Sequence, residues 1–219
     1  MTKKVAFFHT TMNTPLPLKK AFEERYPGVP LLTCMDDGVL SEVIAHNDSI
    51  TPGIVRKLIN FANESEKIGA AVCVCMCTTI TEAVAQAAKA VDIPFVTIDG
   101  PMLDKAVTLG ENVALLITAR TTIHASTAAI RRAAVKMGRD HIHSDTILVE
   151  GAFEALNVEK DKAKHDALIA AAARKAAETH DVVVLAQVSM VDAAGLVEDL
   201  PVPVLTSLES GLAQIADYL

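Results

Sequence analysis

The chain has 219 residues, of which 51% are hydrophobic and 21% are charged, and its formal net charge is −7. This length and apolar content favour one large domain or two lobes of about 100 residues, with a sizeable buried core. The acidic balance and the lack of a long Lys/Arg cluster argue against a nucleic-acid-binding protein.

Membrane insertion and export are not expected either. No apolar run approaches the roughly 18 residues of a membrane span, and the apolar stretch near the N-terminus is too short for a signal peptide. The four cysteines are therefore expected to be free thiols in a reducing compartment. The sequence predicts a soluble cytoplasmic protein with no membrane or nucleic-acid partner.

Short apolar, β-branched runs alternate with amphipathic stretches along the chain. The expected strands, in chain order, are 4–9, 29–34, 70–76, 94–98, 112–118, 145–150, 181–187 and 202–207. Several are apolar throughout, which is typical of parallel strands covered on both faces.

Helix signals lie between these strands. Thr51-Pro52 places a capping hydroxyl before a proline, which predicts a helix from there to about Gly69. Further helices are expected over about 79–91 and in the alanine-rich stretch 159–180. Strand–helix alternation of this kind predicts an α/β fold with mainly parallel sheets.

Similar segments recur at a nearly constant separation. VAFF and VALL begin 108 residues apart, IPFVT and VPVLT lie 109 apart, and Cys77 and Gln187 follow similar strands 110 apart. We therefore expect two similar, pseudo-twofold-related lobes, 1–98 with 208–219 and 99–207, although any two α/β halves share some likeness. Ligands in such sheets bind beyond the carboxyl ends of the strands, so both lobes could face one cleft.

Polar side chains, most of which carry a hydroxyl, gather where three of these strands end, each time just before a helix. They are His9, Thr10, Thr11 and Asn13, then Cys77, Thr78 and Thr79, and in the second lobe Thr118, Thr121 and Thr122. Hydroxyls and the free N–H groups of a helix N-terminus suit a carboxylate or phosphate. Ordinary helix capping explains any one cluster, whereas three at corresponding strand ends favour an anion site.

The segment VCVCMCTTI holds three cysteines at alternate positions. Strand residues two apart lie about 6.6 Å apart, whereas two thiolates on one zinc lie at most about 4.6 Å apart, so no metal site is expected. Cys73 and Cys75, inside the apolar run, are expected to be core residues, and Cys34 is expected to be inert. Cys77 stands at the strand end before a helix N-terminus, which lowers a thiol pKa, so we expect it to be reactive.

These motifs resemble the cofactor-independent aspartate/glutamate/hydantoin racemases. CTT at 77–79 is similar to the first cysteine motif of that family, and LAQVSM at 185–190 occupies the place of the second. TPGIVRKL, IPFVTIDGPMLDKAV, KHDALI and PVLTS are similar to one branch, and the resemblance covers nearly the whole chain. It implies two thiols on either side of the α-carbon of a carboxylate, in a site between two α/β lobes, with no pyridoxal phosphate, metal or other cofactor.

The chain departs from that pattern where the second thiol is expected. Gln187 cannot ionise, and Ser189 is a poor acid. His165 and His9 are alternative acids because histidine titrates near neutral pH. An isolated helical histidine such as His165 is, however, more often solvent-facing.

The resemblance and the residues together predict a racemase or isomerase that acts on a small carboxylate, with Cys77, Gln187 and His165 as its catalytic residues. The residues expected to bind the substrate are His9, Thr10, Thr11, Thr78, Thr79, Thr118, Thr121, Thr122 and Ser189. A single-cysteine decarboxylase of malonate-type acids and a non-catalytic carboxylate-binding protein remain alternatives. The family resemblance is also consistent with a homo-oligomer.

Overall fold

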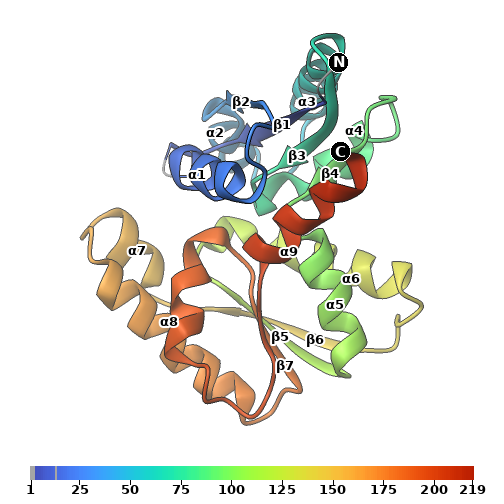
Figure 1. Cartoon of the computed structure of the whole chain (residues 1–219). Coiled ribbons are helices and arrows are strands. Elements are labelled where there is room, and N and C mark those ends of the chain that lie inside the picture. The colour runs from blue at the N-terminus through green and yellow to red at the C-terminus, as the bar shows by residue number, and fades with distance from the viewer. Residues whose placement is uncertain (1–2, 13) are drawn as a thin grey trace. The chain divides into compact units, whose positions relative to one another are not determined.

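The computed structural model describes residues 3–12 and 14–219 (Figure 1). The chain forms two compact units: the first unit is 1–98 with 211–219, and the second unit is 99–210. The chain thus returns to the first unit at Gly211, three residues after the boundary expected from the sequence.

The first unit is built on a four-stranded parallel sheet in the order β2-β1-β3-β4. Its strands are β1 (Lys4–His9), β2 (Leu31–Met35), β3 (Ala70–Cys75) and β4 (Phe95–Thr97). Its helices are α1 (Pro15–Arg25), α2 (Gly38–Ala45), α3 (Pro52–Lys67) and α4 (Thr81–Ala87). Helix α9 (Ser207–Ala213) brings the chain back to this unit.

The second unit has a four-stranded parallel sheet with the corresponding order β6-β5-β7-β8. Its strands are β5 (Asn112–Ile117), β6 (His143–Leu148), β7 (Val182–Leu185) and β8 (Val204–Thr206). Its helices are α5 (Gly100–Leu109), α6 (Ile123–Lys136), α7 (Ala152–Asn157) and α8 (Lys162–Ala177). The predicted α/β class, with two similar lobes of parallel sheet flanked by helices, is confirmed.

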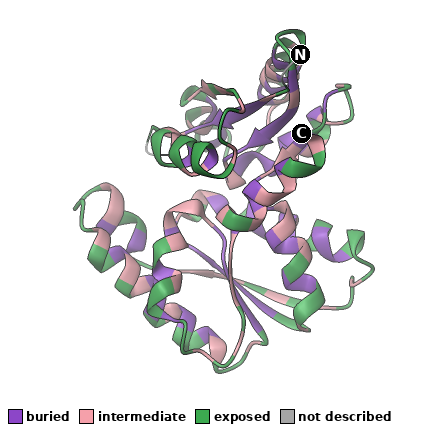
Figure 2. Cartoon of the chain, viewed as in Figure 1, coloured by how far each residue is buried: buried purple, intermediate pink, exposed green. Residues whose placement is uncertain are grey.

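The inner strands β1, β3, β5 and β7 are buried on both faces, as their uninterrupted apolar runs indicate, whereas the outer strands β2, β6 and β8 are more exposed (Figure 2). In β5, Val113, Leu115 and Ile117 belong to one core cluster, while Ala114 and Leu116 belong to another. Successive strand side chains point to opposite faces of a sheet, so two separate clusters mean that helices cover both faces.

One expected helix is replaced in part by a 3₁₀ turn. The stretch predicted as a helix over 79–91 is a 3₁₀ turn, Thr78–Ile80, followed by the shorter α4. The helix that begins at Thr51-Pro52 is confirmed, since the Thr51 hydroxyl accepts a hydrogen bond from the Ile54 N–H at 3.2 Å. Among the described residues, no helix combines the length and the apolar character needed to cross a bilayer.

Candidate active site

Each sheet has a topological switch point at its centre. After β1 the chain goes to β2 on one side, and it then crosses back to form β3 on the other side of β1. The same reversal places β6 and β7 on opposite sides of β5. Ligands of open parallel sheets bind beyond the carboxyl ends of the strands at such a point, so candidate site residues are those at the ends of β1, β3, β5 and β7.

In the first unit, the switch point brings together Cys77 and Thr10. Cys77 follows β3 by two residues and precedes the 3₁₀ turn, and Thr10 directly follows β1. The sulfur of Cys77 forms hydrogen bonds with the hydroxyls of Thr10 and Thr79 and with the backbone N–H groups of Thr79 and Ile80. Two expected binding residues therefore contact the expected nucleophile, although Thr10 is far from it in the sequence.

The acidity of Cys77 differs from the sequence prediction. The four hydrogen bonds favour the thiolate, but burial of the thiol has the larger effect and raises the pKa of Cys77 above its ordinary value. The prediction of a lowered pKa is therefore wrong, because it considered the helix N-terminus and not the desolvation of the sulfur. The side chain is half-buried and packs against the edge of the first unit's core.

His9 is the last residue of β1 and is buried. Its Nδ1 lies 3.1 Å from the hydroxyl of Thr14, and its Nε2 has no hydrogen-bond partner among the described residues. Burial lowers the pKa of His9 to about 4, so the ring is neutral at neutral pH. The Thr11 hydroxyl lies 3.5 Å from that of Thr14, and Asn13 is outside the described residues.

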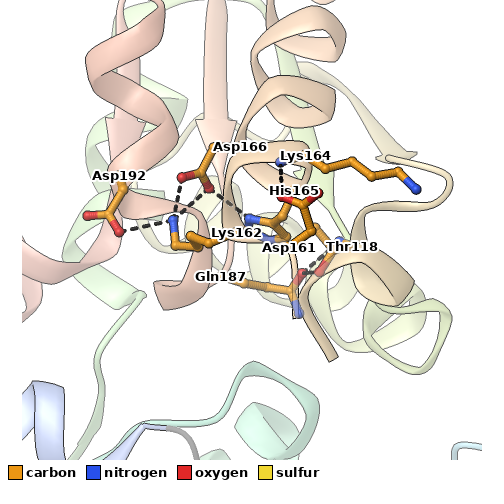
Figure 3. A network of polar contacts seen from close by, with 8 residues as sticks. All are labelled: Thr118, Asp161, Lys162, Lys164, His165, Asp166, Gln187 and Asp192. Carbon is orange, nitrogen blue, oxygen red and sulfur yellow. Dashed lines mark hydrogen bonds and ion pairs between the residues drawn. The ribbon is translucent and has the colours of Figure 1, made fainter. Parts of the chain in front are cut away.

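In the second unit, the corresponding switch point joins Thr118, which follows β5, to Gln187, which follows β7 by two residues (Figure 3). The Oε1 atom of Gln187 accepts hydrogen bonds from the backbone N–H of Thr118 at 2.6 Å and from its hydroxyl at 2.7 Å. Thr118 is buried and Gln187 is half-buried.

The other hydroxyl residues of the second unit that were expected to bind the substrate are Thr121, Thr122 and Ser189. Thr122 is buried, and its hydroxyl donates to the carbonyl of Ala119 at 2.7 Å within its own turn without capping α6. Thr121 and Ser189 are half-buried.

His165 lies in the first turn of α8 and is fully buried, whereas an isolated helical histidine is more often solvent-facing. Its Nδ1 is 2.8 Å from Asp166 Oδ1, and Lys162 Nζ is 2.6 Å from the same oxygen and 3.0 Å from Asp192 Oδ2 (Figure 3). Because an ionised carboxylate can only accept, the N–H at Nδ1 donates this hydrogen bond. The buried Nε2 has no hydrogen-bond partner among the residues the structure describes.

A family model described as Asp/Glu/Hydantoin racemase matches residues 17–215. The chain belongs to the Asp/Glu/hydantoin racemase family. A search of the curated proteins finds no match to this chain.

Solved structures of similar fold include members of this family and a decarboxylase. An aspartate racemase homologue from Pyrococcus horikoshii OT3 is 20% identical with a TM-score of 0.70, covering 98% of both chains. Glutamate racemase RacE1 from Bacillus anthracis is 13% identical with a TM-score of 0.66, covering 98% of this chain and 80% of its own. A liganded double variant of arylmalonate decarboxylase is 21% identical with a TM-score of 0.63, and the match covers 99% of this chain and 92% of the decarboxylase. At these identities the likeness concerns the fold alone.

The other cysteines of this racemase-family chain lie in or beside the core. Cys73 and Cys75 are fully buried in the first unit's core cluster, where the sequence places them. Burial raises the pKa of the half-buried Cys34 thiol, and the nearby Asp36 carboxylate raises it further. Across residues 3–12 and 14–219, no group of three or more His, Cys, Asp and Glu side chains is arranged to hold a metal ion.

Three neighbours of the candidate residues were not predicted from the sequence, namely Thr14, Lys162 and Asp192. The spacing of Lys162 and Asp166 is the i,i+4 separation that supports ion pairs on a helix, and it was available as a signal. No local pattern connects Asp192 to α8, since it lies on the 3₁₀ segment after β7.

We expect the burial of neutral His9 to make stability depend on pH. His9 takes up its proton near pH 6.5 in the unfolded chain and only near pH 4 in the folded chain. The stabilisation of the folded state by the neutral ring is therefore complete above about pH 6.5 and is lost as the pH falls through about 4. Between pH 7 and 4.5 the loss is about 2–3 kcal/mol. Urea unfolding at both pH values should show a smaller loss for His9→Gln than for the wild type. His124→Gln, which removes an exposed imidazole, should behave as the wild type. Equal losses in all three proteins would contradict the expectation.

Proposed function

We propose that the chain is a cofactor-independent enzyme of the racemase/isomerase type, in which Cys77 transfers a proton at the carbon α to the carboxylate of a small substrate. The observation that supports this most is the position of the Cys77 sulfur at the first unit's switch point, among hydrogen bonds from two hydroxyls and two backbone N–H groups. These groups stabilise a thiolate, and a thiolate is the form that removes a proton.

In the proposed reaction the thiol of Cys77 first gives up its proton to water, and the resulting thiolate takes the α-hydrogen as a proton. The electron pair of the broken C–H bond moves into the carboxylate to give an enediolate, and return of a proton to the carbon completes the cycle. The residues proposed to help bind the substrate are His9, Thr10, Thr11, Thr78, Thr79, Thr118, Thr121, Thr122 and Ser189. His165 is proposed as a further acid.

A second candidate is a decarboxylase of malonate-type acids, and the acidity of Cys77 favours it. Burial raises the pKa of this thiol, so the resting side chain is protonated. A protonated thiol acts first as an acid. When one carboxyl group of the substrate leaves as CO₂, its electron pair forms the enediolate, and the S–H of Cys77 supplies the proton that the carbon needs.

The test is isotope exchange in D₂O with the purified full chain. We expect ¹H NMR to show loss of the α-proton signal from at least one of D- and L-aspartate and D- and L-glutamate, or formation of phenylacetate from phenylmalonate. Exchange without net loss of the compound supports the racemase/isomerase type, and release of CO₂ supports the decarboxylase. Saturable binding of these acids with neither reaction would overturn both and leave a carboxylate-binding protein.

A further inference from the structure

Strand β2 forms one edge of the first unit's sheet, and within the described chain it pairs with β1 alone. At the start of this ladder the Val5 N–H donates to the Pro30 carbonyl at 3.0 Å. At its end the Asp36 N–H donates to the His9 carbonyl, also at 3.0 Å. Alternate residues of an edge strand turn their backbone groups toward the neighbouring strand, so the residues of β2 with even numbers face β1. The backbone N–H and C=O groups that point outward are those of Leu31, Thr33 and Met35.

The side chains along this edge carry no charge. Strand β2 has the sequence LLTCM, in which Leu32 and Cys34 pack against the core cluster of the first unit. Successive side chains of a strand point to opposite faces, so the other three lie on the opposite face of the sheet. Of these, Thr33 is exposed, and Leu31 and Met35 are half-buried.

The corresponding edge of the second unit is formed by β6, and it is charged. His143 and Asp145 on β6 are exposed, and His143 Nε2 lies 3.2 Å from Asp145 Oδ1. The other oxygen of this carboxylate, Oδ2, lies 3.1 Å from His180 Nε2. Charged side chains on an edge strand keep it from pairing with a strand of another chain. Strand β6 has this protection and β2 does not, although the two strands occupy equivalent places in their sheets.

We propose that β2 pairs with β2 of a second copy of this chain, in antiparallel orientation and centred on Thr33, so that the chain is a homodimer. This pairing places Leu31 opposite Met35 of the partner subunit and Thr33 opposite Thr33 of the partner subunit. The three outward-facing residues of each copy then exchange roughly six backbone N–H···O=C bonds, two for each opposed pair. The sheets of the two first units join into one continuous sheet.

Charge favours a second copy of this chain as the occupant of the edge. The net charge of −7 makes two copies repel overall, so they approach most easily along an uncharged strand. The nearest acid, Asp36, would lie opposite Pro30 of the partner subunit, and its Oδ2 is already 2.9 Å from Lys57 Nζ. No like charges are therefore directly opposite each other. The outward residues are apolar, threonine and apolar in either direction, and such self-complementarity is what a two-fold contact requires.

Sedimentation velocity of the purified full chain over a series of concentrations tests the dimer. We expect the wild type to be a dimer that dissociates on dilution. Thr33→Lys keeps the ladder to β1, because the backbone of this residue points outward, but it places two ammonium groups face to face across the two-fold axis. We expect the dissociation constant of the dimer to rise roughly 5- to 30-fold, from repulsion and from loss of the Thr–Thr pair.

Thr146→Lys is the matched control for this substitution. Thr33 pairs with Phe7 and Thr146 with Leu115, which hold the same place in VAFF and VALL, so the lysine is added at the equivalent position of β6. The dissociation constant should stay within about twofold of the wild-type value. A wild-type chain that is monomeric at every concentration overturns the proposal, and so does a dimer that is equally strong in the two variants.

A disulfide tests the register of the pairing. Opposed residues of a hydrogen-bonded antiparallel pair have Cα atoms about 5.5 Å apart, a separation that suits a disulfide. Thr33→Cys, in a chain that also carries Cys34→Ser, is oxidised with copper–phenanthroline, and mass spectrometry of the digested product locates the link. We expect a covalent dimer joined at position 33, and none from Thr146→Cys in the same background. A Thr33→Cys chain that stays monomeric after oxidation, or that is linked elsewhere, contradicts pairing centred on Thr33.

Discussion

Replacing Cys77 by serine is expected to lower the rate of α-proton exchange roughly 10²- to 10⁴-fold, the usual contribution of a positioned acid or base. The serine hydroxyl can keep the hydrogen bonds to Thr10, to Thr79 and to the backbone N–H of Ile80. It is, however, a far weaker acid than a thiol, so it neither releases nor recovers a proton at a useful rate. Because the substitution is small and the contacts are kept, the fold should survive.

The measurement is the rate of deuterium incorporation, taken alongside thermal unfolding of the same samples. Cys34→Ser is the matched control, because Cys34 is also a half-buried thiol of the first unit whose pKa is raised by burial. It should exchange the substrate at the wild-type rate. A Cys77→Ser protein that unfolds at the wild-type temperature and still exchanges at the wild-type rate would remove Cys77 from the mechanism.

Replacing Gly211 by alanine is expected to cause the largest loss of stability. Gly211 lies where the chain returns to the first unit, and a Cβ atom there would stand 2.1 Å from the carbonyl oxygen of Ile98 and 2.5 Å from its Cδ1. The oxygen belongs to the backbone just beyond β4, so it cannot turn aside as a flexible side chain would. We expect a cost of about 2–3 kcal/mol, in the range for overpacked sites, and a fall in Tm of roughly 4–12 °C.

Gly195→Ala provides the control for this substitution. A Cβ at Gly195 would have no heavy atom within 4 Å, so the same added methyl group should change Tm by no more than about 2 °C. Differential scanning calorimetry of the three proteins measures both effects. A Gly211→Ala protein as stable as the wild type would mean that the close approach to Ile98 does not exist in solution.

Much of the fold follows from local patterns. All eight strands and the start of the helix at Thr51-Pro52 lie where their residues predict them, because apolar β-branched runs and capping residues act within a few neighbours. The placement of Cys73 and Cys75 in the core follows from the same local pattern. Helix ends are less well predicted, as the 3₁₀ turn Thr78–Ile80 shows, since fixing them depends on packing against the sheet.

The sequence by itself determined the α/β class, the family and the positions of Cys77 and Gln187 at corresponding strand ends. Only the tertiary structure decided which hydroxyl meets each of them, because β1 and β3, like β5 and β7, are neighbours in the sheet but not in the chain. It also decided that burial outweighs four hydrogen bonds at the Cys77 sulfur and that His165 is enclosed. Desolvation depends on all the atoms that surround a group, and most of those atoms come from residues distant in the sequence.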